Sequence, residues 1–599
     1  MRNGRWRYWG PLAIVLILAF ALRLWGIKQG LPYVYNVDEY GHFVPEAVAM
    51  FHHGLNPHYF INPPALTYLL HVIFAIWLGG RVGVTHEFAL HPDRLFLVAR
   101  ITVALLGTLS VWLLYLVGAR LFNRAAGLLA SAVMAVAFLP VFYGHLALND
   151  VPTLAPLTLS LLGTAGILRR GRMLDYLMAG VGLGLAGATK YTAGVMVLPL
   201  LAAAVARYLD GRADARGGAA QANGRAGARR DVAIGLGVAL AATLGAYLIA
   251  NPYSLLDFHL FIDELKRQSS YTEMSHASWI GGPKQSSFIY YLWSFTWGLG
   301  WIPALAALGG AVSIWRGQRR VGWVLVPVAV LYLLFLSLQG RYFGRWLLPI
   351  FPIACLLAAN FALELAGWAA RRAPRLHTSF TALAVIALAA QGTVYSIHSG
   401  LLLSRADTRN LARAWVVKNI PVGARIVVEP VVPNAWLDDT GRLGAGAVRW
   451  VKYPTLRVLL NPSSGIPEPT HRTVLLENYE STLGPALISY YERNGYCWVV
   501  SGYTQSGRAF ADPQTVPDAI AYYRELERQG EVVYHISPYG SGKSSSGNGG
   551  PGQSRVAFNF DWTFDYYPLA FHRPGPEMTI YRLRGGRCAS VTGQAGSSA

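Results

Sequence analysis

Two acidic points in this chain have residue types that can do chemistry. Asp38 and Glu39 are adjacent, with His42 one helical turn further on, and Asp150 follows Asn149 farther along the chain. An ionised carboxylate can take a proton from an acceptor hydroxyl or amine. The carboxylate pair together with His42 could also hold a divalent cation. The competing interpretation is that these residues only cap helices, because Asp and Asn are common at helix starts. In the first acidic segment, Asp38 would be the capping residue.

Two basic points carry the complementary charge. Lys190 precedes Tyr191, and Arg341 and Tyr342 are followed closely by Arg345. Arginine binds phosphate oxygens bidentately, and lysine binds them as a point charge. Long basic side chains also extend from apolar segments to the membrane surface without binding a ligand. Binding of a phosphate at the membrane surface is the functional interpretation of these residues.

The acidic and basic residues lie between apolar segments of membrane-spanning length, which must position them. The chain has 599 residues, of which 53% are hydrophobic and 14% charged, with a mean hydropathy of +0.33. Soluble domains carry about 25% charged residues. Runs of spanning length cover residues 11–27, 95–118, 125–143, 152–168, 175–189, 192–208, 232–250, 288–314, 321–338, 346–366 and 378–400. They predict a polytopic α-helical membrane domain over residues 1–400 with about eleven spans of roughly 20 residues each.

Charge placement predicts how these spans are oriented. The net charge of +20 reflects arginines clustered in short turns between alternate apolar runs, where the positive-inside rule places them on the cytoplasmic side. We therefore expect a multi-pass protein of the plasma (inner) membrane whose N-terminus is cytoplasmic. The positive charge is expected to contact membrane lipids and not nucleic acid. The run 63–78 is too short to span comfortably, so we expect an outer juxtamembrane or re-entrant helix there. With that choice, the acidic and basic points all face the extracytoplasmic side.

The same residues lie in segments that resemble a known enzyme family. Four segments, in order, are similar to signature regions of GT-C glycosyltransferases, and the closest branch is that of the protein O-mannosyltransferases and lipid A aminoarabinose transferases. They run from Asp38 to Leu69, from Leu148 to Pro152, from Thr189 to Leu201 and from Arg341 to Pro352. The resemblance covers residues 10–370 and implies a GT-C-like fold.

The resemblance also implies a reaction. The donor would be a polyprenyl-phosphate sugar, mannose or a related one, and the acceptor an extracytoplasmic protein, lipid or glycan, with inversion at the anomeric carbon. Asp38 would be the base, Glu39 would position the acceptor, and Asp150 would line the same cavity. The donor phosphate would be bound by Lys190, Arg341, Tyr342 and Arg345, and the substrate pocket would include His42, Asn149 and Tyr191. No cofactor is expected, although His42 departs from the family pattern and leaves a divalent cation open.

Three other functions stay open at the level of sequence. A transporter or lipid-carrier flippase predicts inverted repeats, and no internal repeat is visible. A function as a non-catalytic scaffold would not explain why the acidic and basic residues are all expected on the same side of the membrane. A ligase of lipid-linked polysaccharide should have a large outer loop with its own basic site, and the loop 251–287, with Lys266 and Arg267, keeps this function open.

Residues 401–599 have the pattern of a soluble, extracytoplasmic α/β domain. Expected helices cover 407–419 and 517–528, and expected strands cover 425–429, 474–476, 497–500, 531–535 and 579–583. A flexible insertion is expected at 540–554. Asp438, Asp439 and the aromatic segment 558–567 could contact sugar or pack in the domain. Cys497 and Cys588 could pair outside the cytoplasm, whereas Cys355 is expected to be buried in an apolar run.

Overall fold

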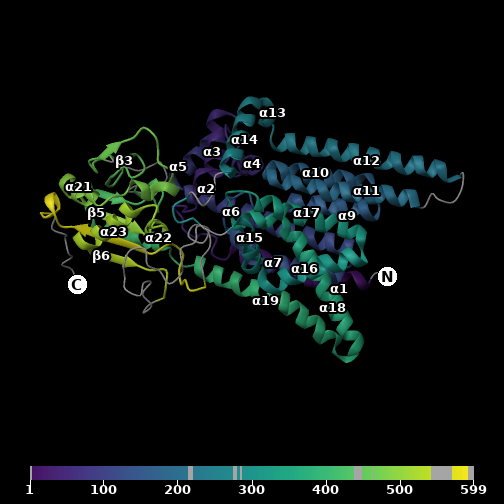
Figure 1. The fold of residues 1–599 in the computed structure, drawn as a ribbon. Helices are drawn as coiled ribbons and strands as arrows, with labels where there is room; N and C mark the ends of the chain where they lie inside the picture. The colour runs from purple at the N-terminus through teal and green to yellow at the C-terminus, as the bar shows by residue number, and fades with distance from the viewer. Residues whose placement is uncertain are drawn as a thin grey trace.

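A bundle of apolar helices forms the larger part of the protein, and a smaller domain built on a β-sheet lies at one end of it (Figure 1). The computed structural model describes residues 3–213, 220–273, 279–282, 286–437, 448–461, 463–540 and 569–590. The bundle is made of α1 (Asn3–Leu24), α6 (Pro92–Leu121), α7 (Arg124–Val136), α8 (Phe138–Phe142), η1 (Tyr143–His145), α9 (Leu154–Arg169), α10 (Met173–Thr189), η2 (Tyr191–Met196), α11 (Val197–Ala213), α12 (Ala220–Ala250), α15 (Ser287–Phe295), η4 (Thr296–Gly300), α16 (Trp301–Gly317), α17 (Arg319–Ser337), η5 (Gly344–Ile350), α18 (Phe351–Arg372) and α19 (His377–Leu403).

These helices coincide with the predicted spans. Within the described residues, seven helices are long and apolar enough to cross a membrane, or up to nine if each of two bent pairs is one span. One bent pair is formed by α7 with α8 and η1, at 59°. Three shorter apolar helices, α1, α9 and α10, occupy the remaining predicted spans. The prediction of a polytopic α-helical protein is confirmed.

Short helices lie at the end of the bundle that is nearer to the sheet domain (Figure 1). They are α2 (Val37–Gly41), α3 (Val44–His53), α4 (Ala65–Leu78), α5 (Arg81–Leu90), α13 (Tyr253–Leu256) and α14 (Phe258–Glu273). Helices α4 and α5 are bent by 96° at their break, as in a broken span or a re-entrant hairpin. The turn uses Gly79 and Gly80 at φ values of 73° and 92°, which glycine adopts without strain. The side of the membrane that each loop faces stays a prediction.

The smaller domain contains a five-stranded mixed sheet with the strand order β2-β1-β5-β7-β6. Its central strands β1 (Arg425–Val428) and β5 (Tyr496–Gly502) are parallel and buried along most of their length. Strand β2 (Val451–Lys452) extends the parallel part, and the antiparallel strands are β7 (Met578–Leu583) and β6 (Gly530–Ile536). A separate hairpin pairs β3 (Val458–Leu460) with β4 (Pro467–Pro469). The helices of this domain are α20 (Thr408–Asn419), α21 (Ala486–Asn494), α22 (Tyr503–Ala511) and α23 (Pro517–Gln529).

One predicted strand of this domain is wrong. Residues 474–475 are not in a strand, and a short 3₁₀ helix, η8 (Leu476–Thr482), begins at the next residue. The Val474 N–H donates to the Leu456 carbonyl, but Leu475 is 53% exposed and does not continue a ladder. A short apolar run is therefore not enough to specify a buried strand. Asp438, Asp439, the aromatic segment 558–567 and most of the insertion 540–554 lie outside the described residues.

The sheet domain packs directly against the first loop of the membrane part. The Arg409 guanidinium lies over the Tyr35 ring at 3.6 Å, and the Arg413 guanidinium lies over the Tyr33 ring at 5.2 Å. Asn410 accepts a hydrogen bond from the Tyr35 hydroxyl and donates one to the Leu31 carbonyl. Helix α20 therefore holds the chain segment that leads into α2.

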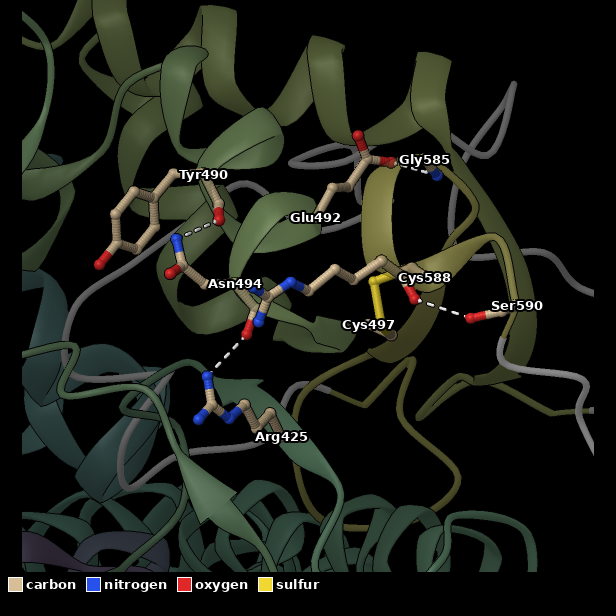
Figure 2. Close-up of a disulfide and its surroundings, with 9 residues drawn as sticks. Arg425, Tyr490, Glu492, Asn494, Cys497, Gly585, Cys588 and Ser590 are labelled. Atoms are coloured by element: carbon tan, nitrogen blue, oxygen red, sulfur yellow. Dashed lines mark hydrogen bonds between the residues drawn. A yellow bond between two sulfur atoms is a disulfide. The ribbon is translucent and has the colours of Figure 1, made fainter.

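A disulfide joins Cys497, on β5, to Cys588, near the end of the described chain (Figure 2). The adjoining segments are also tied by hydrogen bonds: the Gly585 N–H donates to Glu492, and Arg425 donates to the Asn494 carbonyl. The bridge closes a loop over a sequence separation of 91 residues. Structural disulfides are typical of oxidising compartments, so the bridge supports the expectation that this domain is extracytoplasmic.

The orientation can be tested with two exposed positions at opposite ends of the molecule. Val532, on β6, is 55% exposed, and Leu376, in the turn between α18 and α19, is 49% exposed. We expect Val532→Cys to react with a membrane-impermeant maleimide in intact cells, because the sheet domain should lie outside. Leu376→Cys should react only after permeabilisation. The reverse labelling pattern would overturn the orientation. The wild-type chain is the blank, since Cys497 and Cys588 are bridged and Cys355 is buried.

Candidate active site

The first acidic point lies on a short helix that is capped by a neighbouring residue. Asn36 is the N-cap of α2, and its side-chain oxygen accepts the Glu39 N–H at 3.0 Å. Asp38 is therefore not the cap, and the structural interpretation of this residue is wrong. Because Asp38 and Glu39 are adjacent on a helix, their side chains point about 100° apart. The two carboxylates enter different surroundings.

Glu39 is completely buried and forms a two-pronged ion pair with Arg100 of α6. Its oxygens accept from Arg100 Nε at 2.7 Å and Nη2 at 2.8 Å, and one of them also accepts the Ala147 N–H at 2.8 Å. Arg100 donates in addition to the carbonyls of Ile27 and Gln29, both at 2.8 Å. This pair fixes α2 against α6 and against the segment before Asp150. Glu39 does not line the cavity described next.

A cavity of about 670 Å³ lies where the loop that follows α1 meets the ends of α10 and α17, η5 and one face of α14. The structure brings most of the predicted site residues to its wall. Those that line it are Asp38, His42, Asn149, Asp150, Lys190, Tyr191, Arg341 and Arg345. The wall also has apolar parts, including Phe261, Phe335 and Trp346. Residues far apart in the sequence, such as Asp38 and Arg345, which are separated by 307 positions, are therefore neighbours in one cavity.

Charges of opposite sign alternate along the wall. Arg345 Nη2 donates to Asp38 Oδ2 at 2.8 Å, and Arg345 Nε lies 3.7 Å from Asp150 Oδ2. Lys190 Nζ forms an ion pair with the other oxygen of Asp150. The side chain of Asp38 is 46% exposed, whereas that of Asp150 is 4% exposed. Asp38 is thus the carboxylate that a substrate in the cavity could reach, and Asp150 holds two cations in place.

Arg341 is held at the wall by aromatic rings. Its guanidinium lies 4.6 Å from the Trp279 ring centroid and 5.1 Å from that of Phe343. The Arg345 guanidinium lies 4.4 Å from the same Phe343 ring. Cation–π contacts orient a guanidinium without neutralising its charge. Tyr342, which was predicted beside them, does not line the cavity; it is buried against Tyr290, with the ring centroids 4.7 Å apart.

His42 makes a set of contacts that the sequence analysis missed. Its Nδ1 lies 3.2 Å from the Glu46 carboxylate, and its Nε2 lies 3.3 Å from the Tyr59 hydroxyl, whose ring stacks on the imidazole at 4.4 Å. Burial lowers the pKa of His42, but the hydrogen bond and charge of Glu46, together with the charges of Asp38 and Glu264, raise it more, so the net shift is upward. Burial raises the pKa of Glu46, with the His42 contacts acting in the opposite direction. His42 ends α2 and Glu46 lies in the first turn of α3, so their contact depends on the break between the two helices and not on spacing within one helix.

Hydrogen bonds fix the remaining parts of the wall. Asn149 Nδ2 donates to the Thr189 carbonyl at 2.9 Å, which joins the second acidic point to the segment that carries Lys190. The Tyr191 hydroxyl donates to the Phe60 carbonyl at 2.8 Å. Glu264 of α14 accepts the N–H groups of Phe60 and Ile61, at 3.1 and 3.2 Å. Among the described residues, no group of three or more His, Cys, Asp or Glu side chains is placed to hold a metal ion.

The chain is similar to several known proteins. Residues 88–213 match the family described as dolichyl-phosphate-mannose-protein mannosyltransferase. The oligosaccharyltransferase AglB of Archaeoglobus fulgidus, solved with an inhibitory peptide and a dolichol-phosphate, aligns at a TM-score of 0.53 with 13% identity, over 94% of this chain and 78% of that one. The apo form of an oligosaccharyltransferase from the same organism aligns at 0.50 with 15% identity, over 91% and 75%. ArnT of Cupriavidus metallidurans, bound to undecaprenyl phosphate, aligns at 0.42 with 15% identity, over 89% and 97%.

The two oligosaccharyltransferase alignments show a shared fold and nothing beyond it, because their sequence identities are low. No curated protein matches the sequence. The shared fold and the match of residues 88–213 to a mannosyltransferase family agree with the resemblance drawn from four short segments.

The Glu39–Arg100 pair gives a testable expectation for stability. Arg100→Met should lower the free energy of unfolding by about 3–5 kcal/mol, because it leaves the Glu39 carboxylate buried without its partner. Denaturant titration of the purified protein in detergent measures this. Arg94→Met, which removes an exposed pair with Glu87, should cost about 1 kcal/mol or less. Equal losses in the two variants would show that the buried pair does not hold the first loop.

Proposed function

We propose that this chain, a membrane glycosyltransferase of the GT-C type, transfers a sugar from a polyprenyl phosphate to an extracytoplasmic acceptor with inversion. The observation that carries the proposal is the cavity in which Asp38 is exposed beside Lys190, Arg341 and Arg345. A transfer of this kind needs a base for the acceptor and a cation site for the departing phosphate, and both kinds of group face the same space. Mannose or a related sugar is the proposed donor group.

The basic residues are proposed to bind the donor phosphate. Among the described residues of the wall, the cations Lys190, Arg341 and Arg345 lie beside the carboxylates Asp38 and Asp150, and cations of these types bind phosphate oxygens. Arg341 is oriented by Trp279 and Phe343, and Lys190 is anchored by Asp150. When the bond between sugar and phosphate breaks, the phosphate oxygen gains negative charge, which nearby cations stabilise most in the transition state. The alignment with a dolichol-phosphate complex supports a lipid-phosphate donor.

Asp38 is proposed to be the base. It faces the cavity, and the buried pair below it prevents α2 from turning. Arg345 bridges Asp38 and Asp150, so the base lies close to the proposed phosphate site. In the proposed reaction, an acceptor hydroxyl or amine that contacts Asp38 attacks the anomeric carbon on the face opposite the departing phosphate, which inverts that carbon. Glu39 is proposed to act as a positioning residue for this base.

The extracytoplasmic side is the proposed location of the reaction. The first loop that carries Asp38 is packed on the sheet domain through Tyr33 and Tyr35, and that domain contains the Cys497–Cys588 disulfide. Site and sheet domain are therefore at the same end of the bundle (Figure 1). A protein, lipid or glycan on that side of the plasma membrane would be the acceptor.

Replacing the base tests the reaction. Asp38→Asn should lower sugar transfer by about 100-fold or more, because an amide cannot take the acceptor's proton. Mass spectrometry of lipid-linked sugars and surface glycans in a deletion strain, complemented with each variant, measures transfer. Asp263→Asn is the matched control, since Asp263 on α14 is 74% exposed and does not line the cavity. Normal glycans with the Asp38 variant would remove this residue as the base.

Donor binding is tested separately. Lys190→Ala and Arg341→Ala should each weaken binding of a polyprenyl phosphate about tenfold, the equivalent of about 1.4 kcal/mol, through loss of a charged contact to phosphate. Titration of the purified protein in nanodiscs with decaprenyl phosphate gives the affinities. Lys266→Ala serves as the control, since Lys266 is 74% exposed on α14. Unchanged affinity in both test variants would refute the phosphate site.

A further inference from the structure

His42, Tyr59 and Glu46 form a hydrogen-bonded chain that begins at the cavity wall and ends beneath it. Both His42 and Tyr59 line the cavity. The Tyr59 hydroxyl lies 3.3 Å from His42 Nε2, and the Glu46 carboxylate lies 3.2 Å from His42 Nδ1. Apart from the expected place of His42 in the substrate pocket, none of these residues has a role in the proposed transfer as described so far.

The direction of the hydrogen bonds in this chain is fixed by its two ends. At one end, Asn62 Nδ2 donates to the Tyr59 oxygen at 2.9 Å, so the Tyr59 hydrogen is available for another acceptor. At the other end, an ionised Glu46 only accepts, so His42 Nδ1 carries a hydrogen. In a neutral imidazole Nε2 then has the lone pair, and Tyr59 donates to it. A proton reaching the Tyr59 oxygen can thus displace the phenolic proton onto His42.

The charge that this transfer creates would be stabilised where it forms. Glu46 on α3 contacts the imidazole directly, and Thr67 donates to the other Glu46 oxygen at 3.5 Å. Asp38 on α2 and Glu264 on α14 also act on His42 through their negative charges. Glu46, Asp38 and Glu264 all raise the pKa of His42 through their negative charges, so an imidazolium is favoured at this position.

The proposed transfer leaves a proton on Asp38 that must go elsewhere before the next cycle. Neutral imidazole is a stronger base than a carboxylate in ordinary surroundings. His42 follows Asp38 by one helical turn, and the His42 N–H donates to the Asp38 carbonyl at 3.1 Å. Tyr59 faces the same cavity as Asp38. A stronger base therefore lies beside the proposed catalytic carboxylate, with a hydroxyl between it and the cavity.

We propose that Tyr59 and His42 relay the acceptor's proton away from Asp38, with Glu46 as the positioning residue of the imidazole. The inference rests on the proposed function. The acceptor's O–H or N–H bond breaks and its proton binds Asp38, while the new bond to the anomeric carbon forms and the electron pair of the old bond leaves with the phosphate oxygen. The proton on Asp38 then moves to the Tyr59 oxygen as the Tyr59 proton moves to His42 Nε2. The imidazolium returns its proton to solvent, which restores all groups.

The experiment is the pH profile of sugar transfer by the full chain in nanodiscs. The probe is radiolabelled decaprenyl-phosphate mannose, and the acceptor source is envelope vesicles from the deletion strain. His42→Gln and Tyr59→Phe should each lower kcat at pH 7 by about tenfold or more with little change in KM for the donor. Tyr59→Phe keeps the ring stacked on His42, so its effect is specific to the hydroxyl. His71→Gln is the control, because His71 contacts the Ala47 carbonyl and Phe51 and does not line the cavity.

The shape of the profile separates a relay from a structural role. His42 must be neutral to accept a proton, so the wild-type rate should fall as the pH drops through the raised pKa of His42. Glu46→Gln removes the charge that raises this pKa, so the fall should move to lower pH. In His42→Gln this limb of the profile should be absent. Wild-type transfer with an unchanged profile in His42→Gln overturns the relay alone, whereas a wild-type chain that transfers no sugar overturns the proposed function and the relay with it.

Discussion

The buried ion pair between Glu39 and Arg100 is the contact on which the candidate site depends. A buried carboxylate is costly unless its oxygens are satisfied, and here a guanidinium and a backbone N–H satisfy them. Because Arg100 also holds the carbonyls of Ile27 and Gln29, the start of the first loop, α2 and α6 form one rigid unit. The neighbouring residue, Asp38, is left on the face of α2 that meets the cavity.

The second constraint is the alternation of charge around that cavity. Arg345 lies between Asp38 and Asp150, and Lys190 lies on the other side of Asp150. Each of these four charged side chains contacts one of opposite charge. The contacts hold the cations in position and keep the two carboxylates apart. A site organised in this way has little rearrangement to undergo when a charged substrate enters, which is the general advantage of preorganised electrostatics.

The sheet domain contributes to the same rigidity from the opposite side. Its helix α20 contacts Tyr33 and Tyr35, just before α2. In the membrane part, α14 reaches the loop on its other flank, where Glu264 binds the N–H groups of Phe60 and Ile61. The first loop is thus fixed by a buried ion pair, by aromatic and cationic contacts and by backbone hydrogen bonds. Loops that carry functional residues generally need such support from rigid elements.

The sequence by itself determined the bundle, the α/β pattern of most of the second domain and the residue types at the site, because hydropathy, periodicity and charge placement are local properties of the chain. Only the tertiary structure decided that Asp38 faces the cavity while Glu39 pairs with Arg100, 61 residues away. It also excluded Tyr342 from the wall and joined His42 to Tyr59. These outcomes depend on which side chains meet when helices pack, and no local pattern contains the partners that a buried charge will find.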